Sequence, residues 1–228
     1  MQYLIDTANI ESIKKCCEFY PVTGVTTNPT IISREHSTDF KNIIYTIREI
    51  IGPDRMLHVQ TTASDAKQIL AEAEAVRNLV GGKFFIKIPI TAEGLKACAM
   101  CKDKGIGVTM TAIFTQQQAL IAANAGADFV APYINRLDNI VSDGVHVVEE
   151  IVSMFRKNDV KTKILAASFK NVEQVHKVAM TGADAVTINP DLFEMLVYHP
   201  LTYYAIDDFC KDWETIYGDQ TILDILGK

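Results

Sequence analysis

Several features that would assign the sequence to a particular class of protein are missing. Its five cysteines are odd in number and irregularly spaced, which argues against a disulfide framework and favours a reduced compartment. No apolar run reaches the roughly 20 residues that a membrane-spanning helix needs. Residues 1–6 show no basic segment followed by a long apolar one, so no signal peptide is expected. These absences predict a cytoplasmic protein with no membrane partner.

The charge balance offers little positive charge for binding a polyanion. There are 22 Lys and Arg residues against 28 Asp and Glu residues, a net charge of −6, and both signs are mixed along the chain. A nucleic-acid-binding surface is therefore not expected. This composition still allows a local basic pocket for one small anionic substrate.

Sequence motifs for several common chemistries are also absent. No Gly-x-Gly-x-x-Gly follows the first predicted strand and no Gly-x-Ser-x-Gly occurs, which disfavours a dinucleotide-binding domain and a serine hydrolase. The five histidines lack His-x-His and His-x-x-x-His spacing, so no metal site is predicted and His58 is expected to fill the core. Cys98 and Cys101 form a Cys-x-x-Cys within helical sequence, and we interpret them as small residues on one helix face.

Short apolar runs typical of strands alternate with longer stretches typical of amphipathic helices. The clearest helical stretches are residues 66–78 and 115–125. This alternation predicts parallel strands joined by right-handed helical crossovers. The eight predicted strands are residues 3–5, 24–26, 57–60, 84–88, 107–111, 129–133, 164–167 and 185–188.

Internal echoes indicate a repeated unit of about 28 residues. Gly-Ala-Asp occurs at 126–128 and again at 182–184, 56 residues later, and Gly-Val-Thr at 24–26 recurs at 107–109. Each Gly-Ala-Asp is expected to end a helix, with glycine in the left-handed conformation. Because no linker-like segment divides the chain, we predict a single-domain (β/α)8 TIM barrel over residues 1–228. Residues 202–228 would form a C-terminal helical extension whose aromatic residues cover the barrel or pack on a neighbouring subunit.

Polar residues follow the predicted strands. In a closed (β/α)8 barrel, function gathers at the carboxyl ends of the strands, so these residues should converge on one face. Each could be an ordinary turn residue, but their convergence favours a site. The residues at these ends are Asp6, Thr26 to Asn28, Gln60, Lys87, Thr111, Tyr133 to Arg136, Ser168 to Lys170 and Asn189.

Lys87 is the strongest candidate for a catalytic residue. It interrupts an otherwise apolar strand, residues 84–90, of the kind that is covered on both faces. Desolvation there favours the neutral amine, which is the nucleophilic form of lysine. The alternative is a lysine at a strand end whose side chain reaches solvent. We predict instead that Lys87 is a buried nucleophile.

A phosphate pocket is predicted after the sixth and seventh strands. Arg136 provides a planar fork of donors, Ser168 a hydroxyl and Lys170 a point charge, a combination that suits a phosphate dianion. Loops after the later strands often bind phosphate in these barrels. The alternative is three unrelated surface residues.

Five ordered motifs resemble those of the small transaldolase family and its fructose-6-phosphate aldolase branch. They lie at residues 4–7, 24–29, 85–95, 131–136 and 165–170, and the resemblance covers essentially the whole chain. It implies a class I aldolase or transaldolase that needs no metal or organic cofactor and acts on sugar phosphates. It also implies a decamer of two pentameric rings, in which the C-terminal helix reaches a neighbour.

The resemblance also implies a role for each candidate residue. Lys87 would form the Schiff base at C2 of a ketose, and Asp6 would assist proton transfer at the leaving aldehyde. Thr26 and Asn28 would hold the donor, with Asn28 close to the Schiff-base nitrogen. The phosphate of the aldehyde half would bind to Arg136, Ser168 and Lys170.

Two positions distinguish the branches of the family. Transaldolases use a Glu that activates water through a Thr, and the sixth strand usually ends in Phe, whereas this sequence has Gln60, Thr111 and Tyr133. These residues predict an aldolase that splits fructose 6-phosphate into dihydroxyacetone and glyceraldehyde 3-phosphate. One alternative is a transaldolase of the pentose phosphate pathway that transfers dihydroxyacetone to erythrose 4-phosphate. Another is a non-catalytic barrel that binds sugar phosphates.

Overall fold

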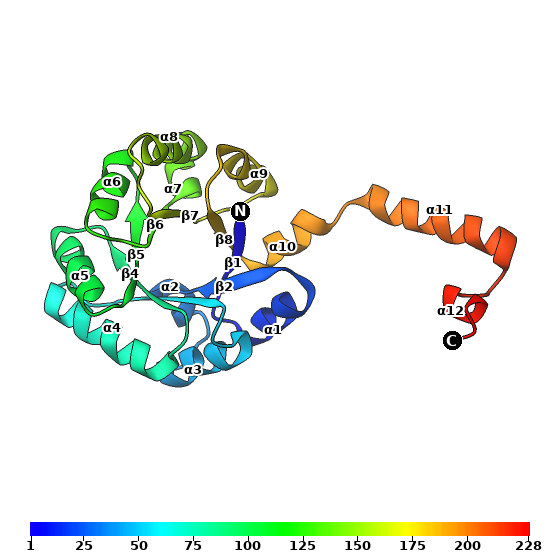
Figure 1. Cartoon of the computed structure of the whole chain (residues 1–228), viewed down its shortest axis with the longest axis horizontal. Coiled ribbons are helices and arrows are strands. Elements are labelled where there is room, and N and C mark those ends of the chain that lie inside the picture. Colours follow the sequence, from blue (N-terminus) through cyan, green and yellow to red (C-terminus); the bar gives the residue numbers. More distant parts are fainter. The chain divides into compact units, whose positions relative to one another are not determined.

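Eight parallel strands close into a barrel in the order in which they occur in the sequence (Figure 1). The computed structural model describes residues 1–228, and β1 pairs with both β2 and β8 to close the ring. All eight predicted strands are confirmed, with ends that differ by at most two residues. Their bounds are β1 (Gln2–Asp6), β2 (Val22–Thr26), β3 (Met56–Gln60), β4 (Phe84–Pro89), β5 (Gly107–Ile113), β6 (Phe129–Pro132), β7 (Lys163–Ala166) and β8 (Ala185–Ile188).

Helices between the strands surround this barrel, as Figure 1 shows. Most begin after a polar residue whose side chain accepts a hydrogen bond from the first helical turn, as Asp65 and Asn171 do. The (β/α)8 fold predicted from the sequence is thus confirmed. The helices that lie between the strands in the sequence and after β7 are α1 (Ile10–Phe19), α2 (Pro29–Ser33), α3 (Phe40–Ile51), α4 (Ala66–Val80), α5 (Ala92–Asp103), α6 (Gln116–Asn124), α7 (Ile134–Asp138), α8 (Gly144–Lys157) and α9 (Val172–Thr181).

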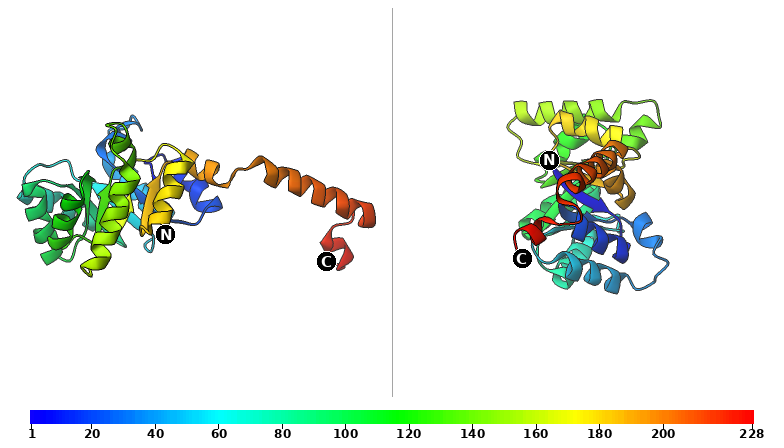
Figure 2. Two further views of the ribbon diagram at one scale, coloured as in Figure 1. Left: turned by 90° about the horizontal axis from the view of Figure 1, so that it is seen from above. Right: turned by 90° about the vertical axis from the view of Figure 1, so that its right-hand side faces the viewer.

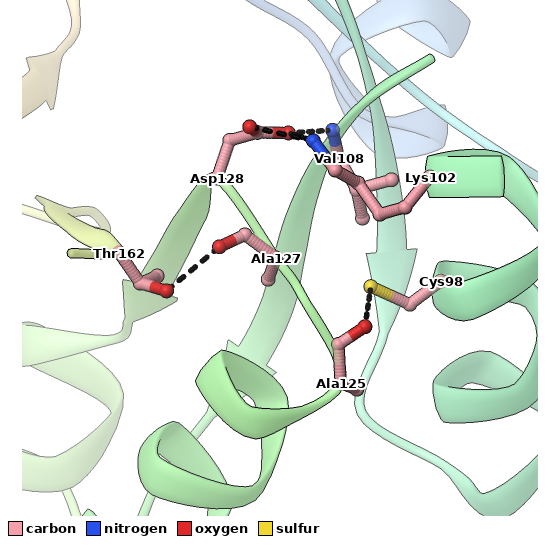
Figure 3. Close-up of polar contacts among 7 residues, drawn as sticks. All are labelled: Cys98, Lys102, Val108, Ala125, Ala127, Asp128 and Thr162. Atoms are coloured by element: carbon pink, nitrogen blue, oxygen red, sulfur yellow. Dashed lines mark hydrogen bonds and ion pairs between the residues drawn. The ribbon is translucent and has the colours of Figure 1, made fainter. Parts of the chain in front are cut away.

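The two Gly-Ala-Asp segments have the same structure. Gly126 and Gly182 follow α6 and α9 with φ angles of 93° and 84°, the left-handed conformation that glycine adopts without strain. The carboxylate of Asp128 accepts a hydrogen bond from Val108 N and forms an ion pair with Lys102 (Figure 3). Asp184 accepts the equivalent bond from Ile164 N. In both repeats, therefore, the aspartate accepts a hydrogen bond from the amide of the second residue of the preceding strand.

The amino-terminal half of the barrel interior is apolar. His58 lies just above this layer, fully buried, with its ring stacked on Phe85 at a centroid distance of 4.7 Å. Its Nδ1 lies 2.8 Å from Thr109 Oγ1, and its Nε2 is buried without a hydrogen-bond partner. The prediction that His58 fills the core is confirmed. The core cluster beneath it consists of Leu4, Met56, Phe129, Leu165 and Ala185.

Cys98 and Cys101 lie on one face of α5, as predicted, and that face is buried. Cys98 Sγ donates a weak hydrogen bond to Ala125 O (Figure 3). Burial raises the pKa of the Cys98 thiol to about 12 and that of Cys101 to about 11. Both thiols are therefore protonated at neutral pH and serve as packing groups.

The chain divides into two compact units, Met1–Phe193 and Glu194–Lys228. Helix α10 (Pro190–Val197) spans the division, which lies eight residues before the predicted start of the extension. The second unit also contains α11 (Pro200–Tyr217) and α12 (Ile222–Ile225), and α11 buries no residue. Within the first unit, α8 and α9 lie side by side in both views of Figure 2. No helix combines the length and apolarity needed to cross a membrane.

Candidate active site

Lys87 lies inside the barrel rather than at its outer surface. Only 3% of the residue is exposed, and its Nζ donates a hydrogen bond to the backbone carbonyl of Thr27 at 3.0 Å. In the barrel, Lys87 pairs with Gln60 of β3 and Thr109 of β5. The alternative interpretation, a lysine that reaches solvent, is wrong. The amine is held in a defined position among polar groups of the neighbouring strands.

A chain of hydroxyl groups leads to Asp6 at the end of β1. Thr26 Oγ1 donates to Asp6 Oδ1 at 2.6 Å, and it also lies 2.6 Å from Thr187 Oγ1. Because the single hydroxyl proton of Thr26 is used for Asp6, Thr187 donates to Thr26. The two threonines are fully or almost fully buried. Together they fix one oxygen of the carboxylate and leave the other free for a substrate hydroxyl.

The carboxyl group of Asp6 is electrostatically unusual. Desolvation by burial raises its pKa above 3.8, although the positive charge of Lys87, the Thr26 hydrogen bond and Arg34 oppose that rise. A carboxylate with a raised pKa is a better base and a readier proton donor than an exposed one. Asp6 is thus suited to exchange a proton close to Lys87.

Thr111 and Tyr133 form a second polar pair at the barrel mouth, and Gln60 ends β3 at the same end of the barrel. The hydroxyls of Thr111 and Tyr133 lie 3.2 Å apart, so one proton can be shared between them. Gln60 Oε1 is buried and has no hydrogen-bond partner within the chain. An unpaired buried acceptor is costly unless a ligand or water supplies a donor. Gln60 can therefore accept a hydrogen bond from a water molecule or a ligand hydroxyl.

Backbone strain occurs at two strand ends beside these residues. Ala112, next to Thr111, has a φ of 57° where the pairing of β5 with β6 is interrupted, and Ser168 has a φ of 66° after β7. Neither residue is a glycine, so each conformation costs free energy, roughly 1 kcal/mol or more. Strained residues of this kind often occur at active sites, where they direct a neighbouring side chain.

The three predicted phosphate-binding residues lie on adjoining segments. Arg136 is in the short helix α7, with its guanidinium 5.1 Å from the centre of the Tyr133 ring. The backbone amides of Ile134 and Asn135 donate to the carbonyls of Ala167 and Ser168, so α7 is fastened to the β7–α9 turn. Arg136 and Ser168 are thereby brought together. The exposed side chain of Lys170 makes no hydrogen bond or ion pair.

Asn28 lies at the junction of β2 and α2. Its Oδ1 accepts a hydrogen bond from Ile31 N at 2.9 Å and so caps α2. This bond fixes the side chain next to Thr27, whose carbonyl holds Lys87. The amide nitrogen of Asn28 has no partner within the chain and can donate to a bound ligand.

Thr187 belongs to the site but was not among the predicted residues, whereas Thr27 lies within the predicted strand end at residues 26–28. Thr27 contributes a backbone carbonyl, which no side-chain pattern reveals. Thr187 lies inside β8, two residues before Asn189, and strand alternation places both on the same face. That alternation was the only signal in the sequence for Thr187.

One cavity of the barrel unit lies at the opposite end of the strands. It measures about 630 Å³ and is lined by the strand starts, including Gln2, Met56, Lys83, Phe85 and Lys163. None of the predicted site residues lines it. Conserved chemistry in this fold is built at the carboxyl ends instead, so the group around Lys87 is the better candidate.

The comparison with known protein families agrees with this geometry. Residues 3–221 match the family described as Transaldolase/Fructose-6-phosphate aldolase. The chain belongs to this family. The resemblance inferred from the five motifs is therefore confirmed, as is the class of enzyme, although not the choice between its two reactions.

Individual members of the transaldolase/fructose-6-phosphate aldolase family match over nearly their whole length. A probable fructose-6-phosphate aldolase of Streptococcus pneumoniae is 42% identical over 222 residues, which cover 97% of this chain and 100% of the relative. A probable transaldolase of Clostridioides difficile is 41% identical over 214 residues, which cover 94% and 97%. Both names thus occur among relatives of similar identity.

Solved structures with low sequence identity share only the fold. Flavocytochrome b2 with sulfite bound has a TM-score of 0.60 at 13% identity, covering 83% of this chain and 56% of the other. A mandelate oxidase has a TM-score of 0.58 at 12% identity, covering 83% and 64%. This chain spans less than two thirds of either protein.

Proposed function

We propose that this protein is a fructose-6-phosphate aldolase that acts through a Schiff base on Lys87. The observation that carries the proposal is the buried amine of Lys87, which donates a hydrogen bond to Thr27 O at 3.0 Å. The amine is also close enough to Asp6 for its charge to lower the pKa of that carboxyl group. A lysine needed only for binding would gain nothing from such burial, which is costly for a charged group. Covalent catalysis explains why it is there.

In the proposed reaction, the neutral amine of Lys87 attacks the C2 carbonyl of fructose 6-phosphate and water leaves. The resulting protonated imine accepts the electron pair of the C3–C4 bond as that bond breaks. Asp6 takes the proton of the C4 hydroxyl, and glyceraldehyde 3-phosphate leaves. The enamine that remains is protonated at C3, and water then releases dihydroxyacetone and regenerates the amine. No metal or organic cofactor is needed in this sequence.

The choice of the aldolase over the transaldolase rests on Gln60 and Tyr133. The Thr111–Tyr133 hydroxyl pair, at 3.2 Å, can relay a proton to the water that hydrolyses the imine. With hydrolysis efficient, the three-carbon unit leaves without waiting for an acceptor aldehyde. The runner-up is transfer to erythrose 4-phosphate, which the names of several relatives favour.

The test is the release of glyceraldehyde 3-phosphate from fructose 6-phosphate, with and without erythrose 4-phosphate, in the presence of a chelator. Catalytic release without acceptor is expected. Release only with acceptor would show that the transaldolase reaction is the correct one. Tyr133→Phe keeps the ring under Arg136 but removes the hydroxyl, so it should slow cleavage more than transfer.

The Schiff base is tested separately by trapping with borohydride in the presence of dihydroxyacetone, followed by peptide mass spectrometry. Modification of Lys87 is expected. Lys87→Ala should abolish turnover, whereas Lys83→Ala should not, since Lys83 precedes the same strand but is exposed at its other end. An unmodified Lys87 would refute the Schiff-base mechanism. Without turnover, it would favour a non-catalytic barrel that binds sugar phosphates.

A further inference from the structure

Gln174 is a buried polar residue that the reaction described above does not use. It lies in the first turn of α9, and only 8% of its surface is exposed. Both ends of its side-chain amide are occupied. Oε1 accepts a hydrogen bond from Lys170 N at 2.8 Å, and Nε2 donates to Asp138 Oδ2 at 2.6 Å and, more weakly, to Asn135 Oδ1 at 3.4 Å.

These contacts link the two segments that carry the proposed phosphate-binding residues. Lys170 belongs to the turn after β7, while Asn135 and Asp138 flank Arg136 in α7. Asp138 is fixed in turn, because its Oδ1 accepts from Gly144 N at 2.9 Å at the start of α8. One amide therefore joins the helix of Arg136 to the turn of Ser168 and Lys170.

An equivalent residue in another repeat shows that this bridge is additional to ordinary helix capping. Gln118 occupies the same position in α6, three residues after the N-cap Thr115, and its Oε1 accepts from Phe114 N at 2.9 Å. This matches the Lys170 N bond of Gln174. Gln118 Nε2, however, makes no hydrogen bond to another element. The bond from the amide nitrogen to α7 is specific to the repeat that carries Lys170.

We propose that Gln174 is a positioning residue that sets the affinity for the substrate's phosphate. The inference rests on the proposed function. Arg136 and Lys170 are both exposed cations, which repel one another when no phosphate lies between them. Holding them at a fixed separation before binding lowers the cost of ordering them around the anion. We call the link from Lys170 N through the Gln174 amide to Asp138 the brace. The brace should therefore affect binding of a phosphorylated aldehyde and not the chemistry at Lys87.

The decisive substitution is Gln174→Glu. The glutamate can still accept from Lys170 N, but its second oxygen faces the Asp138 carboxylate, so a hydrogen bond becomes a repulsion. Aldol addition of dihydroxyacetone is measured with glyceraldehyde 3-phosphate and with unphosphorylated glyceraldehyde. The ratio of the two kcat/KM values is expected to fall about tenfold, the effect of losing one hydrogen bond to a charged group, through KM of the phosphorylated aldehyde.

Asp138→Asn combined with Gln174→Glu should restore the ratio. The asparagine Oδ1 can accept from Gly144 N while its Nδ2 donates to the glutamate, which re-forms the bridge with reversed polarity. Gln118→Glu is the matched control and should change the ratio less than twofold. An unchanged ratio in folded Gln174→Glu, an equal fall in the control, or no rescue by the double variant would each overturn the proposal. If Gln174→Glu melts below the assay temperature, Gln174→Met is measured in the same way.

Binding of inorganic phosphate separates this inference from the proposed function. Calorimetric titration should show about tenfold weaker binding to Gln174→Glu and recovery in the double variant, whether or not the protein cleaves fructose 6-phosphate. A wild-type protein that turns over neither aldehyde but follows this binding pattern would refute the aldolase and leave the brace standing. Equal phosphate affinity of the wild type and Gln174→Glu would refute the brace alone.

Discussion

Mild acid should destabilise this protein through His58. The imidazole is fully buried between Phe85 and Phe129. Desolvation by burial lowers its pKa well below 6.5, and the positive charges of Lys87 and Lys83 lower it further. The folded state therefore keeps His58 neutral at a pH at which the unfolded chain binds a proton.

The size of the effect follows from this difference in proton binding. The contribution is fully present above pH 6.5, and it is lost as the pH falls, because only the unfolded state gains a proton. At pH 5.5 the loss is about 1.4 kcal/mol, the free energy of one pH unit. For a chain of this size that corresponds to a decrease of roughly 3–6 °C in the melting temperature.

The assay is thermal unfolding at pH 7.5 and pH 5.5, at one protein concentration, for the wild type and for His58→Phe. The phenyl ring can keep the stacking on Phe85, while the loss of the Thr109 hydrogen bond lowers stability equally at both pH values. Other titrating groups are common to both proteins and cancel. The acid-induced decrease should be smaller in the variant by the amount given above, and equal decreases in the two proteins would refute the reasoning.

Three further outcomes are expected. Asp6→Asn should increase stability at neutral pH, because burial raises the Asp6 pKa and makes the ionised carboxylate costly in the folded state. The same substitution should lower cleavage on the order of a hundredfold, and a melting curve and an activity assay check the two effects. Thiol labelling of the native protein at pH 7.5 should modify exposed Cys210 and spare Cys98 and Cys101, whose raised pKa values suppress the thiolate, and equal labelling rates would contradict this. Gly24→Ala should destabilise the barrel by roughly 1–3 kcal/mol in chemical unfolding, because the new methyl group would lie 2.4 Å from Met56 O, a backbone atom that cannot move aside.

The barrel and the face that carries the candidate site were predictable because both depend on local patterns. Buried parallel strands are short apolar runs, and a lysine within one, such as Lys87, is conspicuous. Strand ends in this fold share one face, so Asp6, Gln60, Thr111 and Tyr133 could be grouped without knowing any distance. The Gly-Ala-Asp turns could be placed for the same reason, since glycine at a helix end has a local conformational role.

Contacts that depend on three-dimensional register were not predictable. Thr26 and Thr187 are 161 residues apart, and only closure of β1 between β2 and β8 brings their hydroxyls to 2.6 Å. The positive φ of Ala112 had no signal, because no glycine marks the interruption of β5. Gln174 looked like an ordinary capping residue, since its bond to Asp138 joins helices separated by another helix and a strand.

The neutral state of His58 also has a consequence for Lys87. His58 bonds to Thr109, the residue that pairs with Lys87 across β4 and β5, and the charge of Lys87 lowers the His58 pKa. The proposed imine carries a full positive charge throughout bond cleavage, and a protonated His58 would repel it at short range. Burial prevents that protonation. Asp6 is then the charged partner of Lys87, and the positive charge of Lys87 opposes the rise in the Asp6 pKa that desolvation causes. In the proposed mechanism, the apolar base of the barrel therefore contributes to the chemistry at its mouth, because it determines which charges can exist near the imine.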